Sequence, residues 1–150
     1  MVHVVSNLEF AKKSEEAGVD AIVCEGFEAG GHNGKEEITS MCLIPNVSEN
    51  INIPVIAAGG IGSGKAMLAA FSLGAEGVQI GSRFVASQEC SAHTNFKDAV
   101  VESKEGDTML SLKKLTAVRL LNNNFYQKVV EAENRGDSTE ELRDLLGRGR

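Results

Sequence analysis

The sequence is short of cysteine and of positive charge, and each shortage argues against a class of protein. Its three cysteines, Cys24, Cys42 and Cys90, are odd in number and form no CxxC pair. A disulfide framework is therefore not expected, and a reducing, cytoplasmic location is the simplest interpretation. The formal net charge of -6 argues against a nucleic-acid partner, because binding to phosphate backbones requires a basic surface.

Long apolar runs and the common catalytic or metal-binding spacings are also missing. The start, Met1 to Asn7, has neither the basic region nor the apolar core of a signal peptide. No apolar run approaches the length needed to span a bilayer. There is no HExxH, no Cys/His cluster and no paired Asp pattern, and Ser63 lacks a GxSxG setting. We therefore expect no metal, no membrane partner and no serine hydrolase.

The sequence does contain an alternating pattern of strands and helices, within an ordinary globular composition that is 42% hydrophobic. Gly18 is the predicted C-cap of the first helix, and Pro45 interrupts the second. The strands are continuous apolar runs, which indicates a parallel sheet buried on both faces and hence an α/β fold. The pattern predicts strands at Val2–Ser6, Ala21–Cys24, Pro54–Ala58 and Gly77–Ile80, and helices at Leu8–Ala17, Thr39–Asn50 and Gly64–Leu73.

The rest of the chain is predicted to be helical. Helices are expected at Asn95–Glu102, once or twice within Thr108–Glu133, and at Thr139–Leu146, where Ser138 and Glu141 form a capping box. We divide the chain into residues 1–107, which carry the glycine clusters, and a helical, truncated C-terminal segment, 108–150. An apolar stripe between Leu110 and Val130 predicts a packing face, made by Leu112, Leu115, Val118, Leu121 and Phe125.

A glycine-rich loop, Glu25–Gly34, follows the strand Ala21–Cys24. Ligands of α/β proteins bind at the carboxyl ends of strands, which places this loop at the expected site. Its single histidine, His32, could act as a base near neutral pH, with Glu28 close enough in sequence to orient it. The alternative is a histidine that only hydrogen-bonds within its loop. We expect His3 and His93 to be structural or exposed.

A second glycine cluster, Gly59–Gly64, joins the strand Pro54–Ala58 to the next helix. Free backbone N–H groups and the positive end of a helix dipole favour a phosphate at such a turn. The segment nearly matches a P-loop, because Lys65 follows Gly64, but Ala66 stands where a P-loop needs a hydroxyl for Mg²⁺. An NTPase is therefore the weaker alternative.

A third cluster, Gly77–Phe84, follows the last predicted strand. Gly81 and Ser82 can present N–H and O–H donors, and Arg83 can add charge or form a surface salt bridge. Two such turns after successive strands are more specific than one, because the loops after the last two strands of a (β/α)8 barrel commonly share one phosphate site.

Together, the segments EGFEAGGH (Glu25–His32), PVIAAGGI (Pro54–Ile61) and GVQIGSRF (Gly77–Phe84) resemble the nitronate monooxygenase (2-nitropropane dioxygenase) family. That family is close kin to the FMN-dependent enoyl-acyl-carrier-protein reductase II. The resemblance, over residues 1–130, implies a TIM barrel with FMN at the carboxyl ends of its strands. The loop histidine of the family falls on His32, as a catalytic residue. Glu25 stands where the family often has Gln, and Ser82 where it often has Thr. The implied FMN contacts are Gly30, Gly59, Gly60, Gln79, Ile80, Gly81 and Ser82.

The resemblance also implies that the chain is the C-terminal half of the barrel, about strands five to eight. A half-barrel leaves two strand edges and an apolar face uncovered, so we expect a fragment covered by a missing N-terminal half or by a second copy in a homodimer. The leading interpretation is an FMN-dependent oxidoreductase of the nitronate monooxygenase type, which oxidises alkyl nitronates, small molecules, with O₂. The alternatives are an enoyl-acyl-carrier-protein reductase II using NADH or NADPH, and a phosphate-binding half-barrel without turnover.

Overall fold

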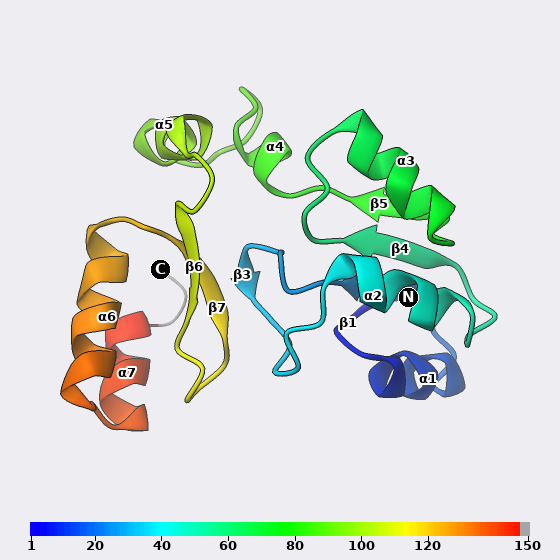
Figure 1. Ribbon diagram of the computed structural model, residues 1–150, viewed down its shortest axis with the longest axis horizontal. Helices are drawn as coiled ribbons and strands as arrows, with labels where there is room; N and C mark the ends of the chain where they lie inside the picture. The colour runs from blue at the N-terminus through cyan, green and yellow to red at the C-terminus, as the bar shows by residue number, and fades with distance from the viewer. Residues whose placement is uncertain (148–150) are drawn as a thin grey trace.

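Four parallel strands form the larger sheet of the structure, a computed structural model that describes residues 1–147 (Figure 1). Each strand pairs in parallel with the next strand of this sheet, in the order β1-β2-β4-β5; β3 belongs to the smaller sheet. This sequential order, with a helix after each of the first three strands, is that of half a (β/α)8 barrel and confirms the predicted α/β class. The strands are β1 (Val2–Val5), β2 (Ala21–Glu25), β4 (Val55–Ala58) and β5 (Gly77–Gln79).

Three helices cover one face of this sheet, α1 (Leu8–Glu16), α2 (Ser40–Ser48) and α3 (Gly64–Ser72). Two of them begin at side-chain caps, because Asn7 accepts a hydrogen bond from the N–H of Phe10 and Ser63 accepts one from the N–H of Ala66. The main core lies between the sheet and these helices. It contains Val5, Ala11, Ile22, Cys24, Leu43, Val47 and Val55.

The other face of the sheet carries the alternate residues of each strand. Glu25, Ala58 and Gln79 form one row across β2, β4 and β5, at the carboxyl ends of these strands. Because a barrel turns this face inward, the row lies at the mouth of the half-barrel, where ligands of this fold bind.

The smaller sheet is antiparallel and combines distant parts of the chain. Its order is β3 (Gly31–His32), β7 (Val118–Leu121) and β6 (Thr108–Ser111). Helices α6 (Asn124–Arg135) and α7 (Thr139–Leu146) pack against it, and Figure 1 shows this assembly on the left, apart from the parallel sheet. Its core is formed by Leu112, Val118, Val129, Ala132 and Leu142.

The prediction of helix throughout Thr108–Glu133 is wrong in its first part, which is the hairpin β6–β7. The apolar stripe is nevertheless a packing face, since Leu112 and Val118 are buried and Leu115 and Phe125 contact them. The apolar residues recur every three to four positions, as in a helix. Here the spacing comes instead from a hairpin in which both the turn and the strand β7 contribute buried residues. Leu112 lies in the left-handed region, at φ +60°, which a continuous helix does not allow.

Two short helices, α4 (Ser82–Val85) and α5 (Thr94–Glu102), connect β5 to the hairpin. The capping box of Ser138 and Glu141 is present at the start of α7, as predicted. Among residues 1–147, no helix is long and apolar enough to cross a membrane. The division of the chain at residue 107 stays a prediction, and Arg148 to Arg150 lie outside the described residues.

Candidate functional site

A cavity of about 360 Å³ opens where β2, β4 and β5 end. Six of the seven residues expected to bind a cofactor line it together, although they come from three separate loops. The seventh, Ile80, is half-buried and packs against the core around α3. The six lining residues are Gly30, Gly59, Gly60, Gln79, Gly81 and Ser82.

The turn after β4 requires glycine at its first position. Gly59 has φ +92°, and a Cβ there would lie 2.7 Å from the carbonyl oxygen of Gly26. Gly60 also has a positive φ, +73°. This backbone shape lets the turn approach the loop after β2 closely, and it leaves the cavity free of side chains on that side.

The turn after β5 leads directly into the short helix α4, with Gly81 as its N-cap. A Cβ on Gly81 would meet no atom within 4 Å, so this glycine borders open space. The hydrogen bonds of residues 1–147 include no acceptor for the N–H groups of Gly60 or Gly81. Because both glycines line the cavity, their backbone N–H groups could serve as donors to an anion bound there.

Glu28 does not orient His32 but closes the start of α2. Its carboxylate accepts hydrogen bonds from the backbone N–H of Ser40 at 3.0 and 3.1 Å, and its Oε2 lies 3.0 Å from Ser40 Oγ. Thr39, the N-cap residue, makes no side-chain cap, so Glu28 supplies the cap from a distant loop. Ser40 Oγ also lies 2.9 Å from the carbonyl oxygen of Gly59, which joins the loop, the helix and the glycine turn.

Glu25 brings a half-buried carboxyl group to the same cavity. Burial raises the pKa of Glu25 above its usual value of 4.5, because the charged form loses hydration. Arg83 and Glu28 also line this cavity, so its charged side chains are of both signs.

His32 lies at the edge of the smaller sheet, exposed, with its backbone opposite Val118. It is not among the residues that line the cavity, although Gly30 is. Of the other histidines, His3 is exposed, and His93 caps α5 by accepting a hydrogen bond from the N–H of Asn95.

A second cavity of about 500 Å³ adjoins the first. The two share Glu28, Gly30, Gly81 and Ser82 in their linings. The walls of the second are mainly apolar and come from α4, α5, β7 and the start of α6. They include Val85, Phe96, Val100, Leu120 and Phe125. Sequence reasoning did not find this cavity, since its walls come from segments that only the hairpin brings together.

The residues that an NTPase or a serine hydrolase would use do not line the first cavity. Lys65, the P-loop-like lysine, is exposed and does not line it, and Ser63 caps α3 instead. Among the described residues, no group of three or more His, Cys, Asp or Glu could hold a metal ion.

Sequence reasoning also missed Ser40 and Arg119. Arg119 lines the second cavity and donates two hydrogen bonds to the carbonyl oxygen of Phe27, 92 positions away. Neither residue belongs to a glycine cluster, so the motifs carried no signal for them.

The chain as a whole is similar to known proteins. A family model described as nitronate monooxygenase matches residues 1–144. The chain is 38% identical over 143 residues to a probable nitronate monooxygenase of Staphylococcus aureus (strain Newman), covering 89% of this chain and 40% of that protein.

Two solved structures are similar over 97% of this chain and 46% of their own length. FabK from Thermotoga maritima has a TM-score of 0.89 and 42% identity. A nitroalkane oxidase from Streptomyces ansochromogenes has a TM-score of 0.78 and 29% identity. The chain spans less than half the length of these relatives, and it belongs to the nitronate monooxygenase family.

Proposed function

We propose that the protein is an FMN-dependent oxidoreductase that oxidises alkyl nitronates with O₂. The observation that carries this proposal is the meeting of two glycine turns, after β4 and β5, at one cavity beside the start of a short helix. Loops after successive strands and a short extra helix commonly bind phosphate at this edge of a (β/α)8 barrel.

The residues present fit the phosphate end of FMN. Gly60 and Gly81 have N–H groups without an acceptor among residues 1–147, Ser82 adds a hydroxyl, and Arg83 adds a positive charge to the same lining. A larger residue at Gly59 is excluded by its contact with Gly26. We infer that these residues hold FMN, together with Gly30 and Gln79, and that Ile80 contributes only through its backbone.

When bound, the flavin supplies the redox chemistry, and the protein supplies position and electrostatics. In this proposal His32 takes the acidic proton of a neutral nitroalkane, or orients the nitronate. His32 itself lines neither cavity, although its neighbour Gly31 lines the second, so this role depends on the resemblance of the loop to that of the family. General-base catalysis of this kind is worth on the order of 10²–10⁴-fold. The second cavity, within the size range of small-molecule sites, would take the substrate.

His32→Ala tests the base. In the flavin-loaded protein we expect it to slow turnover of neutral nitroethane by about 10²-fold or more. Turnover of preformed ethyl nitronate should change much less, because that substrate has already lost its proton. Steady-state oxygen consumption with both substrates measures the difference. Equal, small losses for the two substrates would show that His32 is not the base.

Reduction of an enoyl thioester by NADH or NADPH is the second candidate. The similarity to FabK, at 42% identity against 29% for the nitroalkane oxidase, favours it. Stopped-flow mixing of the flavin-loaded protein with NADH or NADPH, without nitronate, separates the two. Rapid bleaching of the flavin supports the reductase, and indifference to both nucleotides supports the monooxygenase.

Protein that remains colourless after incubation with FMN and gel filtration would point instead to a half-barrel without turnover.

A cytoplasmic location is also proposed, supported by three free cysteines. The remaining barrel strands, from the same protein or a second copy, are the expected partner of the open sheet edges.

A further inference from the structure

The loop that carries His32 has little packing of its own at its tip. Gly30 and Gly31 are exposed, and a Cβ on either would meet nothing within 4 Å. Its far end is held by the hairpin. Gly31 and His32 pair with Arg119 and Val118, and the N–H of Asn33 donates to the carbonyl oxygen of Ala117 at 2.8 Å.

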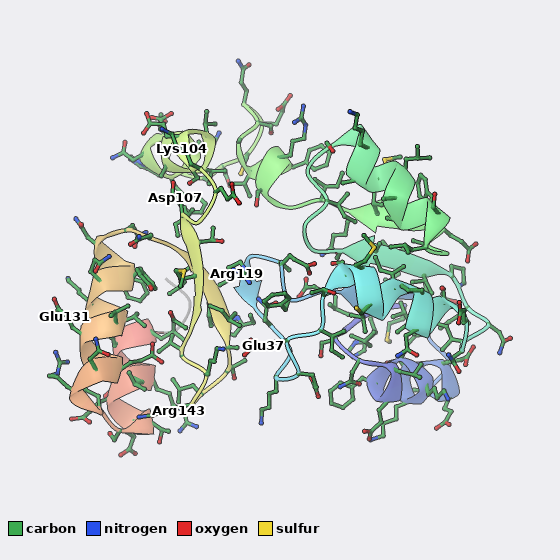
Figure 2. The ribbon with its side chains drawn as sticks, in the orientation of Figure 1. Glu37, Lys104, Asp107, Arg119, Glu131 and Arg143 are labelled. Atoms are coloured by element: carbon green, nitrogen blue, oxygen red, sulfur yellow. The ribbon has the colours of Figure 1, made fainter. Side chains whose placement is uncertain are left out.

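The near end of the loop is held by the same hairpin through one side chain. Arg119 Nε and Nη2 donate to the carbonyl oxygen of Phe27 at 3.1 and 2.9 Å. The guanidinium also lies over the Phe27 ring, 5.2 Å from its centroid, which adds a cation–π attraction. Figure 2 shows Arg119 on the side of β7 that faces this loop. One residue of β7 therefore contacts both ends of the segment 27–32.

The hairpin is a firm support because it has its own core. Leu112 and Val118 are buried against Val129 and Leu142 of α6 and α7. The hairpin contacts the segment between β2 and α2 at few points among the described residues. These are the two-residue pairing of β3, the hydrogen bond from Asn33 to Ala117, the Arg119 contact, and an exposed ion pair between Lys113 and Glu37.

We propose that Arg119 is a positioning residue. Its contact with Phe27, here called the clasp, fixes the segment 27–32 and so holds His32 in one place near the two cavities. Two charge-assisted hydrogen bonds to one oxygen define direction as well as distance. A lysine lacks the planar fork that lets Nε and Nη2 donate together to one oxygen. The catalytic part of this proposal rests on the proposed role of His32, whereas the clasp itself does not.

Hydrogen exchange tests the clasp without any activity. In Arg119→Met we expect the amides of Ala29 and Asn33 to exchange at least about tenfold faster, because their segment opens locally. The amide of Ile22, bonded to Pro54 in the parallel sheet, should not change. Arg119→Lys should fall between wild type and Arg119→Met. Lys113→Gln, which removes the neighbouring exposed ion pair, is the matched control and should exchange like wild type. Unchanged exchange in Arg119→Met would overturn the clasp.

A double-mutant cycle tests the effect on His32. Arg119→Met should reduce nitroethane turnover, through kcat, in the same pattern as His32→Ala, and adding it to His32→Ala should cause no further loss. The dissociation constant for FMN should stay within about threefold, since Arg119 does not line the first cavity. Additive losses would overturn the positioning role. If wild type neither binds FMN nor turns over nitroethane, the proposed function and this catalytic role fall together, and hydrogen exchange alone judges the clasp.

Discussion

At the scale of single residues, the site depends on a close approach of backbone to backbone. A Cβ on Gly59 would lie 2.7 Å from the carbonyl oxygen of Gly26, and a Cβ on Gly26 would meet Ser40 at the start of α2 at under 3 Å. Ser40 Oγ also lies 2.9 Å from the Gly59 carbonyl oxygen. The close fit of the β4 turn against the loop after β2 therefore depends on the absence of side chains at these two positions.

Gly59→Ala should destabilise the protein and weaken flavin binding. Alanine at φ +92° is strained, and its Cβ would lie 2.7 Å from the Gly26 carbonyl oxygen, so a loss of more than about 1 kcal/mol of unfolding free energy is expected. Urea unfolding and fluorescence titration with FMN measure the two effects. Gly62→Ala is the control, because its Cβ meets nothing within 4 Å. Equal stabilities of the two variants would contradict this account.

At the scale of elements, the sequence predicts the helices and strands that are defined by residues close together in the chain. The parallel strands were recognisable as apolar runs between glycine turns, and α7 from its capping box. The hairpin β6–β7 was not, since its strands are defined by pairing with each other and with β3, and β3 is only two residues long. One local sign in the sequence was Asn123, because asparagine is a favoured N-cap and indicates that a new helix starts there. In the structure it caps α6 by accepting hydrogen bonds from the N–H groups of Phe125 and Tyr126.

The same distinction applies to the site. The glycine positions were predictable, because parallel strands bring their carboxyl ends to one edge of the sheet. The contacts of Arg119 and Ser40 were not, since they join residues 92 and 12 to 19 positions apart by side-chain geometry. Glu28, close enough in sequence to orient His32, caps α2 instead, because a carboxylate is favoured at an open helix N-terminus.

The capping box makes α7 dependent on Ser138. The N–H of Glu141 donates to Ser138 Oγ at 3.3 Å, and Glu141 Oε2 accepts from the Ser138 N–H at 2.8 Å. Ser138→Ala should lower the unfolding free energy by about 1 kcal/mol and the melting temperature by roughly 2–4 °C. Calorimetry measures the shift, and Ser91→Ala, at an exposed position, is the control. A shift no larger than that of the control would speak against the cap.

At the scale of the whole molecule, two sheets with separate cores meet at the two cavities. Glu25 lies on the barrel-facing side of the larger sheet, in the row with Ala58 and Gln79. Ionisation of a carboxyl group there opposes folding, because burial removes part of its hydration.

The stability of the fold should therefore depend on pH through Glu25. Since its folded pKa is raised above 4.5, the folded state binds the proton more tightly, and stability falls as the pH rises from about 4.5 through the folded pKa. In Glu25→Gln this fall should be absent. Melting temperatures of both proteins from pH 4 to 8 should converge at the acid end and separate above it, with the variant more stable. Parallel curves would contradict this expectation, and Glu76→Gln, at an exposed site, is the control.

The pairing of β3 with β7 also has a consequence for how the protein forms during synthesis. The glycine loop leaves the ribosome long before residues 118–121, its partners in the smaller sheet. Contacts so distant in sequence close slowly, after the local ones. The four parallel strands can thus assemble while the nascent chain is still growing, and the loop of His32 acquires its final place only in the last stage of maturation.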